Sequence, residues 1–183
     1  MKLIKFSLVM CAAVLAVGCV TKQTYNNEVK TADTYAALSK QLSGELSSDQ
    51  AQITQLQNQL KVTMVNEILF PEGGWTLSPR GEQALAKIAP TLSNLPGQQI
   101  VVEGFTDNVP IGPELKRRFP SNLELSSARA DDVVRYLTSK AVPQNSISAQ
   151  GFGDARPVAS NDTPQDRAKN RRVEIVISAA SRP

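Results

Sequence analysis

Histidine is absent from the 183 residues of the sequence, and aromatic residues make up only 5% of it. The lack of histidine removes the usual general base near neutral pH, the commonest zinc ligand and the Ser–His–Asp triad. The scarcity of aromatics predicts a mainly aliphatic core. Hydrophobic residues still make up 41%, which is enough for one globular domain with extensions. The composition therefore excludes much enzyme chemistry and predicts neither a metal site nor a cofactor.

The chain also has little excess charge of one sign. It contains 20 basic and 17 acidic residues, and two of the basic ones, Lys2 and Lys5, lie in a segment that we expect to be removed. Without them, 18 basic residues face 17 acidic ones, a net charge near +1. So small an excess does not indicate a nucleic acid partner.

Residues 1–18 have the pattern of a signal peptide. An apolar run follows two lysines and ends in small residues before Cys19, and it is shorter than the ~20 residues that a membrane-spanning helix needs. The end of the run, from Leu15 to Cys19, resembles a bacterial lipobox, in which the cysteine becomes acylated. Ala16 departs from the leucine preferred there. The alternative is an ordinary export signal that leaves a free cysteine.

The cysteine count agrees with lipidation of Cys19. The other cysteine, Cys11, lies in the segment that would be removed, so no internal disulfide could form. The next residue, Val20, is not the aspartate that resembles an inner-membrane retention signal. We therefore expect a lipid anchor in the outer membrane that faces the periplasm.

Residues 19–61 are predicted to form a tether. From Thr21 the composition shifts to polar residues with spaced leucines, and five apolar residues approximate a heptad seam. Asp49 interrupts the seam, and Gly44 weakens it by roughly 1 kcal/mol relative to alanine. The pattern predicts a helical coiled coil that could self-associate, and the alternative is a partly disordered linker. The five seam residues are Leu42, Leu46, Ile53, Leu56 and Leu60.

Residues 62–178 are predicted to form one globular domain, followed by a tail over 179–183. Strand-like and helix-like apolar patterns alternate in it, with turn signals between them. Ser78 before a proline marks one helix start, and Ser121 with Glu124 forms a capping box at another. The order β-α-β-α-β-β predicts an α+β two-layer sandwich, with two helices on one face of a small mixed sheet. The expected strands cover 62–70, 99–106, 146–152 and 172–178.

Two residues of opposite charge stand at the ends of neighbouring expected elements. Asp107 closes the second strand, and Arg129 lies in the first turns of the helix that follows. A carboxylate and a guanidinium on one rim of a sheet can receive the two charges of a zwitterion. Structural alternatives stay open, because Asp107 and Arg129 could pair with each other and Asn122 or Asn170 could cap local backbone.

Four sequence blocks of this domain resemble a known family. They are 104–108 (GFTDN), 122–130 (NLELSSARA), 151–153 (GFG) with Pro157 and Asn161, and 167–174 (RAKNRRVE). In this order the blocks resemble the OmpA-like peptidoglycan-binding domain over residues 62–178. Phe105 departs from the pattern where a histidine is frequent, and Asp166 departs where a glycine is usual.

The resemblance implies a ligand and site residues. The ligand would be the meso-diaminopimelate of peptidoglycan stem peptides, with its ammonium on Asp107 and its carboxylate on Arg129. Of Arg171 and Arg172, one is expected to be structural, because adjacent strand residues face opposite sides. Further positions that match the family and would line the same cleft are Thr106, Asn108, Asn122, Asn170 and Arg171.

Together these features predict an outer-membrane lipoprotein that binds peptidoglycan non-covalently and is not an enzyme. Its expected partners are peptidoglycan, membrane lipid through the acylated cysteine, and a second copy through the tether. This protein would hold the outer membrane to the cell wall.

Other functions stay open. The loop over 109–120 resembles the MotB-type version of the domain, which implies a wall-gripping part of a motor, secretion or envelope-stress assembly. Its basic triplet, 116–118, is expected to be solvated, with contact to an anionic polymer or lipid headgroups as the alternative. Murein hydrolysis is less favoured. Glu103 and Asp107 would lie roughly 13 Å apart along a strand, beyond the approximately 5 to 9.5 Å between glycosidase carboxylates.

Overall fold

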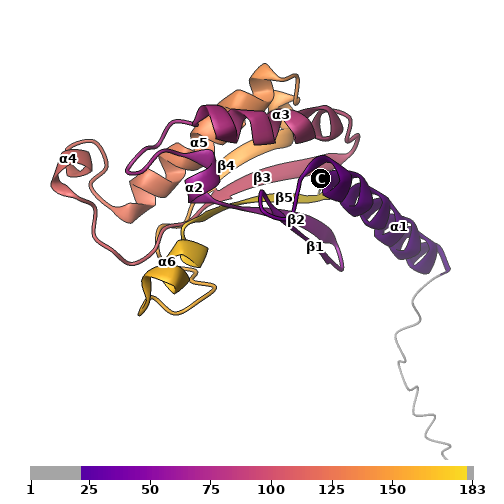
Figure 1. Ribbon diagram of the computed structural model, residues 1–183. Coiled ribbons are helices and arrows are strands. Elements are labelled where there is room, and N and C mark those ends of the chain that lie inside the picture. Colours follow the sequence, from indigo (N-terminus) through magenta and orange to yellow (C-terminus); the bar gives the residue numbers. More distant parts are fainter. Residues whose placement is uncertain (1–21, 181–183) are drawn as a thin grey trace, which may run out of the picture.

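The computed structural model describes residues 22–180, with side chains from residue 31 onward. The predicted leader, the predicted lipidation site at Cys19 and the last three residues lie outside this range. Among the described residues, no helix is both long and apolar enough to cross a membrane. This part of the chain forms one sheet with helices packed on it (Figure 1).

The sheet has five strands in the order β1-β2-β5-β3-β4. Only β3 and β4 pair in parallel, since α5 connects them, and all other neighbours pair antiparallel. The sheet is therefore mixed, and the predicted α+β fold is confirmed. The strands are β1 (Gln52–Leu56), β2 (Gln59–Val65), β3 (Gln98–Gly104), β4 (Ile147–Gly151) and β5 (Arg172–Ala179).

Two long helices, α3 (Pro79–Ser93) and α5 (Asn122–Ser139), lie on one face of the sheet (Figure 1). The side chain of Ser78 caps α3, and the predicted capping box of Ser121 and Glu124 opens α5. Both helices therefore start where the sequence predicts. The short helices are α2 (Asn66–Leu69), α4 (Pro113–Lys116), the 3-10 helix η1 (Gln144–Ser146) and α6 (Pro164–Asn170).

The core lies between the sheet and these helices and is mainly aliphatic, as the composition predicts. Alternate side chains of each inner strand point into it, since successive strand residues face opposite sides. Val62 of β2 and Ile175 of β5 are paired neighbours, for example, and both are fully buried. Fully buried members of the core include Leu60, Val62, Met64, Leu85, Ile88, Leu92, Ile100, Leu137 and Ile175.

The predicted heptad seam is wrong beyond residue 45. The first helix, α1 (Lys22–Glu45), ends there, and the chain then turns into the antiparallel hairpin of β1 and β2. Ile53 and Leu56 lie in β1 on opposite faces of the sheet, and Leu60 lies in β2. Pairing with β2 lets this polar segment satisfy its backbone groups as a strand. The domain boundary predicted at residue 62 thus falls inside β2.

Helix α1 packs against the domain. Tyr35, Leu38, Leu42 and Leu46 are all buried in the common core. The Tyr35 hydroxyl also donates to Gln98 Oε1 at 2.9 Å, where β3 begins. Leu42, Leu46 and Leu60 of the predicted seam are therefore buried within the same chain, whereas Leu56 is 40% exposed.

Candidate functional site

A cleft of about 710 Å³ opens at the end of the sheet where β3 ends and β5 begins. Segments from the whole domain form it: α2 and the turn after it, the loop that holds α4, the first turns of α5, and α6. The side chains that carry its charge and polarity are Asn66, Glu67, Glu72, Thr106, Asp107, Asn122, Arg129, Arg167 and Arg171.

Asp107 lies in the segment after β3, beyond Phe105 and Thr106, and is 7% exposed. Its Oδ1 accepts a hydrogen bond from the Val109 backbone N at 3.1 Å, which fixes the side chain over the following turn. Its Oδ2 accepts from Arg171 Nη1 at 2.8 Å. The Asp107 carboxylate is thus held at the cleft, and Arg171 is the cation that pairs with it.

Arg171 joins two carboxylates at the cleft. Besides Asp107, it contacts Glu67 of α2, with 3.0 Å between Nε and Oε1 and a second bond from Nη2. Burial acts to lower the pKa of Arg171, but the hydrogen bonds to Asp107 and Glu67 outweigh it and raise that pKa above its usual value. The guanidinium therefore stays charged, and it connects α2 to the end of β3.

Arg129 is buried, with 7% exposure, yet it pairs with no carboxylate of the described residues. Its Nε donates to the Gly74 carbonyl at 2.9 Å, and its Cζ lies 5.4 Å from the centroid of the Phe70 ring. Burial lowers its pKa to about 10, and the nearby carboxylates of Glu67 and Asp107 partly oppose this effect. The predicted alternative, an Asp107–Arg129 pair, is therefore wrong, and Arg129 can accept an anion.

The helix α5 brings Asn122, Leu125 and Arg129 to the cleft because residues three, four and seven apart share one helix face. The Asn122 amide donates to the carbonyls of Asp107 at 3.2 Å and of Val109 at 3.1 Å. Asn122 thus holds the loop backbone, which was the structural alternative, while it also lines the cleft.

Thr106 lines the cleft too, and its hydroxyl is buried without a hydrogen-bond partner in the described part of the chain. Five of the seven predicted ligand-binding residues thus gather at one cleft, namely Thr106, Asp107, Asn122, Arg129 and Arg171.

The other two predicted residues, Asn108 and Asn170, do not line this cleft. Asn108 is exposed and borders a neighbouring depression of about 520 Å³. Asn170 is fully buried; its Oδ1 accepts from the backbone N of Val158 and Ala159, and its Nδ2 donates to Ala159 O and to Asn161 Oδ1. Both ends of the Asn170 amide are therefore occupied by hydrogen bonds to the loop before α6. The alternative of backbone capping is correct for Asn170.

Arg171 and Arg172 face different surroundings, as predicted, although only Arg172 belongs to β5 and Arg171 precedes it as the C-cap of α6. Arg172 points away from the cleft, is 4% exposed, and pairs with Glu174 at 2.7 Å between Nε and Oε1. Its Cζ also lies 3.8 Å from the centroid of the Phe105 ring. Arg172 is therefore the structural member of the pair.

Sequence reasoning missed several residues that line the cleft. Glu67, Glu72 and Arg167 add charge, and apolar side chains of the loop over 109–120 form one wall. The three charged residues lie on segments that no spacing rule connects to Asp107, whereas the wall begins at Val109, two residues after Asp107. The apolar side chains of this wall are Val109, Pro110, Ile111 and Leu115. No group of three or more potential metal ligands occurs among the described residues.

Comparison with known proteins agrees with this architecture. The model of the OmpA family matches residues 69–171, more than half of the chain. The chain belongs to the OmpA family. The matched range contains all seven predicted ligand-binding residues, whereas Asn66 and Glu67 of the cleft lining precede it.

Relatives of this OmpA family member include a peptidoglycan-binding protein, ArfA of Mycobacterium bovis, which is 37% identical over 67% of this chain and 36% of its own length. A probable lipoprotein, YiaD of Escherichia coli, is 36% identical over 69% of this chain and 54% of its own length. The chain thus spans about half or less of these relatives. The cell wall anchor of the T6SS from Pseudomonas aeruginosa superposes with a TM-score of 0.70 at 31% identity, covering 78% of this chain and 97% of that one.

Proposed function

We propose that the protein binds peptidoglycan non-covalently by holding the free amino-acid centre of a diaminopimelate residue in the cleft. The observation that carries the proposal is Arg129, a buried guanidinium that pairs with no carboxylate of the described residues and lies near the buried carboxylate of Asp107. A free amino-acid centre supplies the two missing groups, since its carboxylate can bind the arginine fork and its ammonium can bind Asp107.

The charges of the cleft suit a zwitterion better than a simple anion. Arg171 is already paired with Asp107 and Glu67, and Arg167 donates to the backbone carbonyls of Asn161 and Asp162, so Arg129 is the buried cation left for a ligand carboxylate. Asp107 uses one lone pair of each oxygen in the protein, which leaves acceptor capacity for an ammonium. Each charge-assisted bond contributes about 1.5 to 3 kcal/mol, which gives a single site modest affinity.

Anchoring in the outer membrane is the second part of the proposal. The lipobox-like sequence before Cys19 and the relative named as a probable lipoprotein support it. Helix α1 leads toward the N-terminus from the end of the domain opposite α4 (Figure 1). The cleft is lined by Leu115 of α4 and by residues on either side of that helix. Acylation would therefore leave the cleft free to face the wall, and the anchor would raise the local concentration of this weak site.

A wall-gripping part of a larger assembly is the second candidate. The similarity to the cell wall anchor of the T6SS supports it, because almost all of that chain is covered. The same cleft would serve both functions.

Murein hydrolysis has less support. Glu103 lies on the sheet face that carries Lys61 and Glu174, and it does not line the cleft that contains Asp107. The two carboxylates therefore do not share a site, and we propose that the protein performs no chemistry.

Co-sedimentation with isolated sacculi tests the binding. The full chain in nonionic detergent is expected to sediment with sacculi, and Asp107→Ala and Arg129→Ala to abolish this. Arg80→Ala, an exposed arginine of α3, is the matched control and should bind normally. Undiminished sedimentation of both cleft variants would refute the site, and release of soluble muropeptides would refute the absence of chemistry.

Labelling with palmitate in cells tests the anchor. Label is expected in the wild-type chain and not in Cys19→Ala. Equal labelling of the two chains would refute lipidation at Cys19.

A further inference from the structure

Three consecutive cations, Lys116, Arg117 and Arg118, form what we name the basic tip of the loop over 109–120. All three are exposed, and none forms an ion pair with a described carboxylate. Cations elsewhere on the domain are commonly neutralised, as Arg135 is by Asp132. Glu114 in the same short helix still leaves the tip with a net charge of +2. The basic tip is therefore a local excess of unpaired positive charge.

Aromatic packing fixes the position of the basic tip. Phe119, which follows it directly, is only 6% exposed, and its ring packs edge-on against Trp75 with 5.3 Å between centroids. The guanidinium of Arg118 lies over the same tryptophan, with Cζ 4.6 Å from the ring centroid. Such contacts stabilise the loop by hydrophobic burial and by cation–π attraction. The tip is thus held against Trp75, the residue after Gly74, whose carbonyl accepts a hydrogen bond from Arg129.

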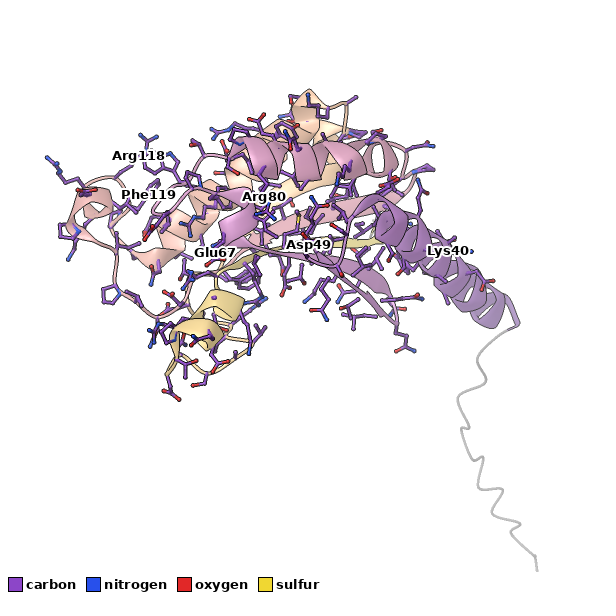
Figure 2. The ribbon with its side chains drawn as sticks, in the orientation of Figure 1. Lys40, Asp49, Glu67, Arg80, Arg118 and Phe119 are labelled. Carbon is purple, nitrogen blue, oxygen red and sulfur yellow. The ribbon has the colours of Figure 1, made fainter. Side chains whose placement is uncertain are left out.

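The basic tip lies at the rim of the cleft. Leu115 lines the cleft, and Lys116, the next residue, borders the neighbouring depression. Figure 1 shows α4 at the end of the molecule farthest from α1, and Figure 2 shows Arg118 and Phe119 at that end and Lys40 of α1 at the other. A membrane surface near the N-terminus would therefore lie away from the tip.

We propose that the basic tip is a second contact surface for peptidoglycan and takes the carboxylates of stem peptides next to the one in the cleft. The inference rests on the proposed function, because the cleft must bring the wall to this end of the domain. Peptidoglycan carries many stem peptides with free carboxylates along its glycan strands, so a chain held at one stem peptide meets others. Charges at the rim of an interface mainly raise the association rate and the salt dependence of binding.

The test removes two charges of the tip without disturbing its packing. Lys116→Gln/Arg117→Gln leaves Arg118 on Trp75, and Lys40→Gln/Lys87→Gln removes the same charge from exposed positions of α1 and α3. In low salt, we expect the tip variant of the full chain to bind sacculi about 3- to 10-fold more weakly than wild type. Near 1 M salt the difference should disappear, because the Debye length falls to about 3 Å. The control should match wild type.

Fluorescence of Trp75, the only tryptophan, reports whether the loop keeps its place in the variant. An unchanged emission spectrum with unchanged sacculus affinity in low salt would overturn the inference.

Two further ligands separate the tip from the cleft and from membranes. A soluble disaccharide tripeptide offers a single stem peptide, so the tip variant should bind it as wild type does. An equal loss on this ligand would overturn the inference, because the tip would then act on the cleft itself. Vesicles with phosphatidylglycerol should bind both proteins equally weakly, and a loss confined to vesicles would assign the tip to lipid. If Arg129→Ala retains the single muropeptide, the proposed function itself fails.

Discussion

Two buried arginines on opposite sides of the sheet edge differ in what surrounds their charge. Arg172, at 4% exposure, has Glu174 as its ion-pair partner, the Phe105 ring beneath its guanidinium, and backbone carbonyls of Asn170 and Arg156 as acceptors. Arg129, at 7% exposure, has one backbone carbonyl and one ring. A buried charge is costly unless it is paired, so similar burial has opposite consequences at the two positions.

The same difference extends to uncharged groups. On α3, the buried hydroxyl of Thr91 donates to Glu45 and accepts from Gln41 of α1. At the cleft, the hydroxyl of Thr106 and the Asn66 amide oxygen are buried and lack protein partners in the described chain. The Arg172 side chain is therefore surrounded by partners, and around Thr91 one described atom, Glu45 Oε2, is buried without one, whereas the cleft holds two such atoms beside Arg129, which pairs with no described carboxylate. Unused bonding capacity, more than burial or charge alone, distinguishes the candidate site.

Replacing each buried arginine by methionine tests this comparison most strongly. Arg172→Met is expected to lower the free energy of unfolding by about 3 kcal/mol, because Glu174 would stay buried with only Lys61 as its partner. Arg129→Met should change it by less than about 1 kcal/mol, because no described carboxylate loses a partner. Urea unfolding at neutral pH measures both values. Equal losses in the two variants would show that Arg129 is structural as well.

The parts of the fold that the sequence predicted follow from local rules. The capping box at Ser121 and the alternation along β5 need no knowledge of distant segments. The packing of α1 against its own domain could not be predicted in this way, because a leucine stripe can pack equally well against a second helix. The hydrogen bond from Tyr35 to Gln98 joins residues 63 positions apart, and it exists only once the sheet is formed.

The candidate site also contains residues that local rules predict and residues that depend on distant segments. Asp107 and Arg129 could be placed together because a strand end and the next helix start meet at one sheet edge. The partner of Asp107 could not be predicted, since Arg171 lies between α6 and β5 and also binds Glu67, which is 104 positions away from it in sequence. Asn170 matches the family motif, but its backbone partners before α6 decide that it is structural.

Two threonine replacements test the same comparison between the cleft and a structural cluster, with smaller expected changes in stability. Thr91→Val is expected to lower the free energy of unfolding by about 1 kcal/mol, because it removes two hydrogen bonds to α1. Thr106→Val should leave it unchanged or raise it by up to about 1 kcal/mol, because it removes a buried hydroxyl that has no partner. Thermal or urea unfolding of both variants provides the measurement. A clear loss in Thr106→Val would mean that this hydroxyl is already satisfied in the free protein.

The smallest expected effect concerns Glu103. It is half-buried beside Lys61, Arg172 and Glu174, which we call the Arg172 cluster, and it forms no ion pair among the described residues. Glu103 of β3 pairs in register with Glu174 of β5. Burial and then repulsion by Glu174 raise the pKa of Glu103 above its ordinary value of 4.5, although Lys61, Arg156 and Arg172 partly oppose this. The folded state therefore favours the protonated carboxyl, so its ionisation costs stability above the raised pKa and has no effect well below 4.5.

Glu103→Gln should accordingly raise the free energy of unfolding at neutral pH, by less than about 1 kcal/mol. This gain should shrink as the pH falls and vanish below about pH 4, where the wild-type carboxyl is protonated in both states. Urea unfolding across this range measures it, with Glu114→Gln, at an exposed position, as the control for the loss of one carboxylate. A variant that is less stable than wild type at neutral pH would mean that attraction by the cations around Glu103 outweighs the cost of burying its charge. Glu103 would then be a fully compensated carboxylate of the Arg172 cluster.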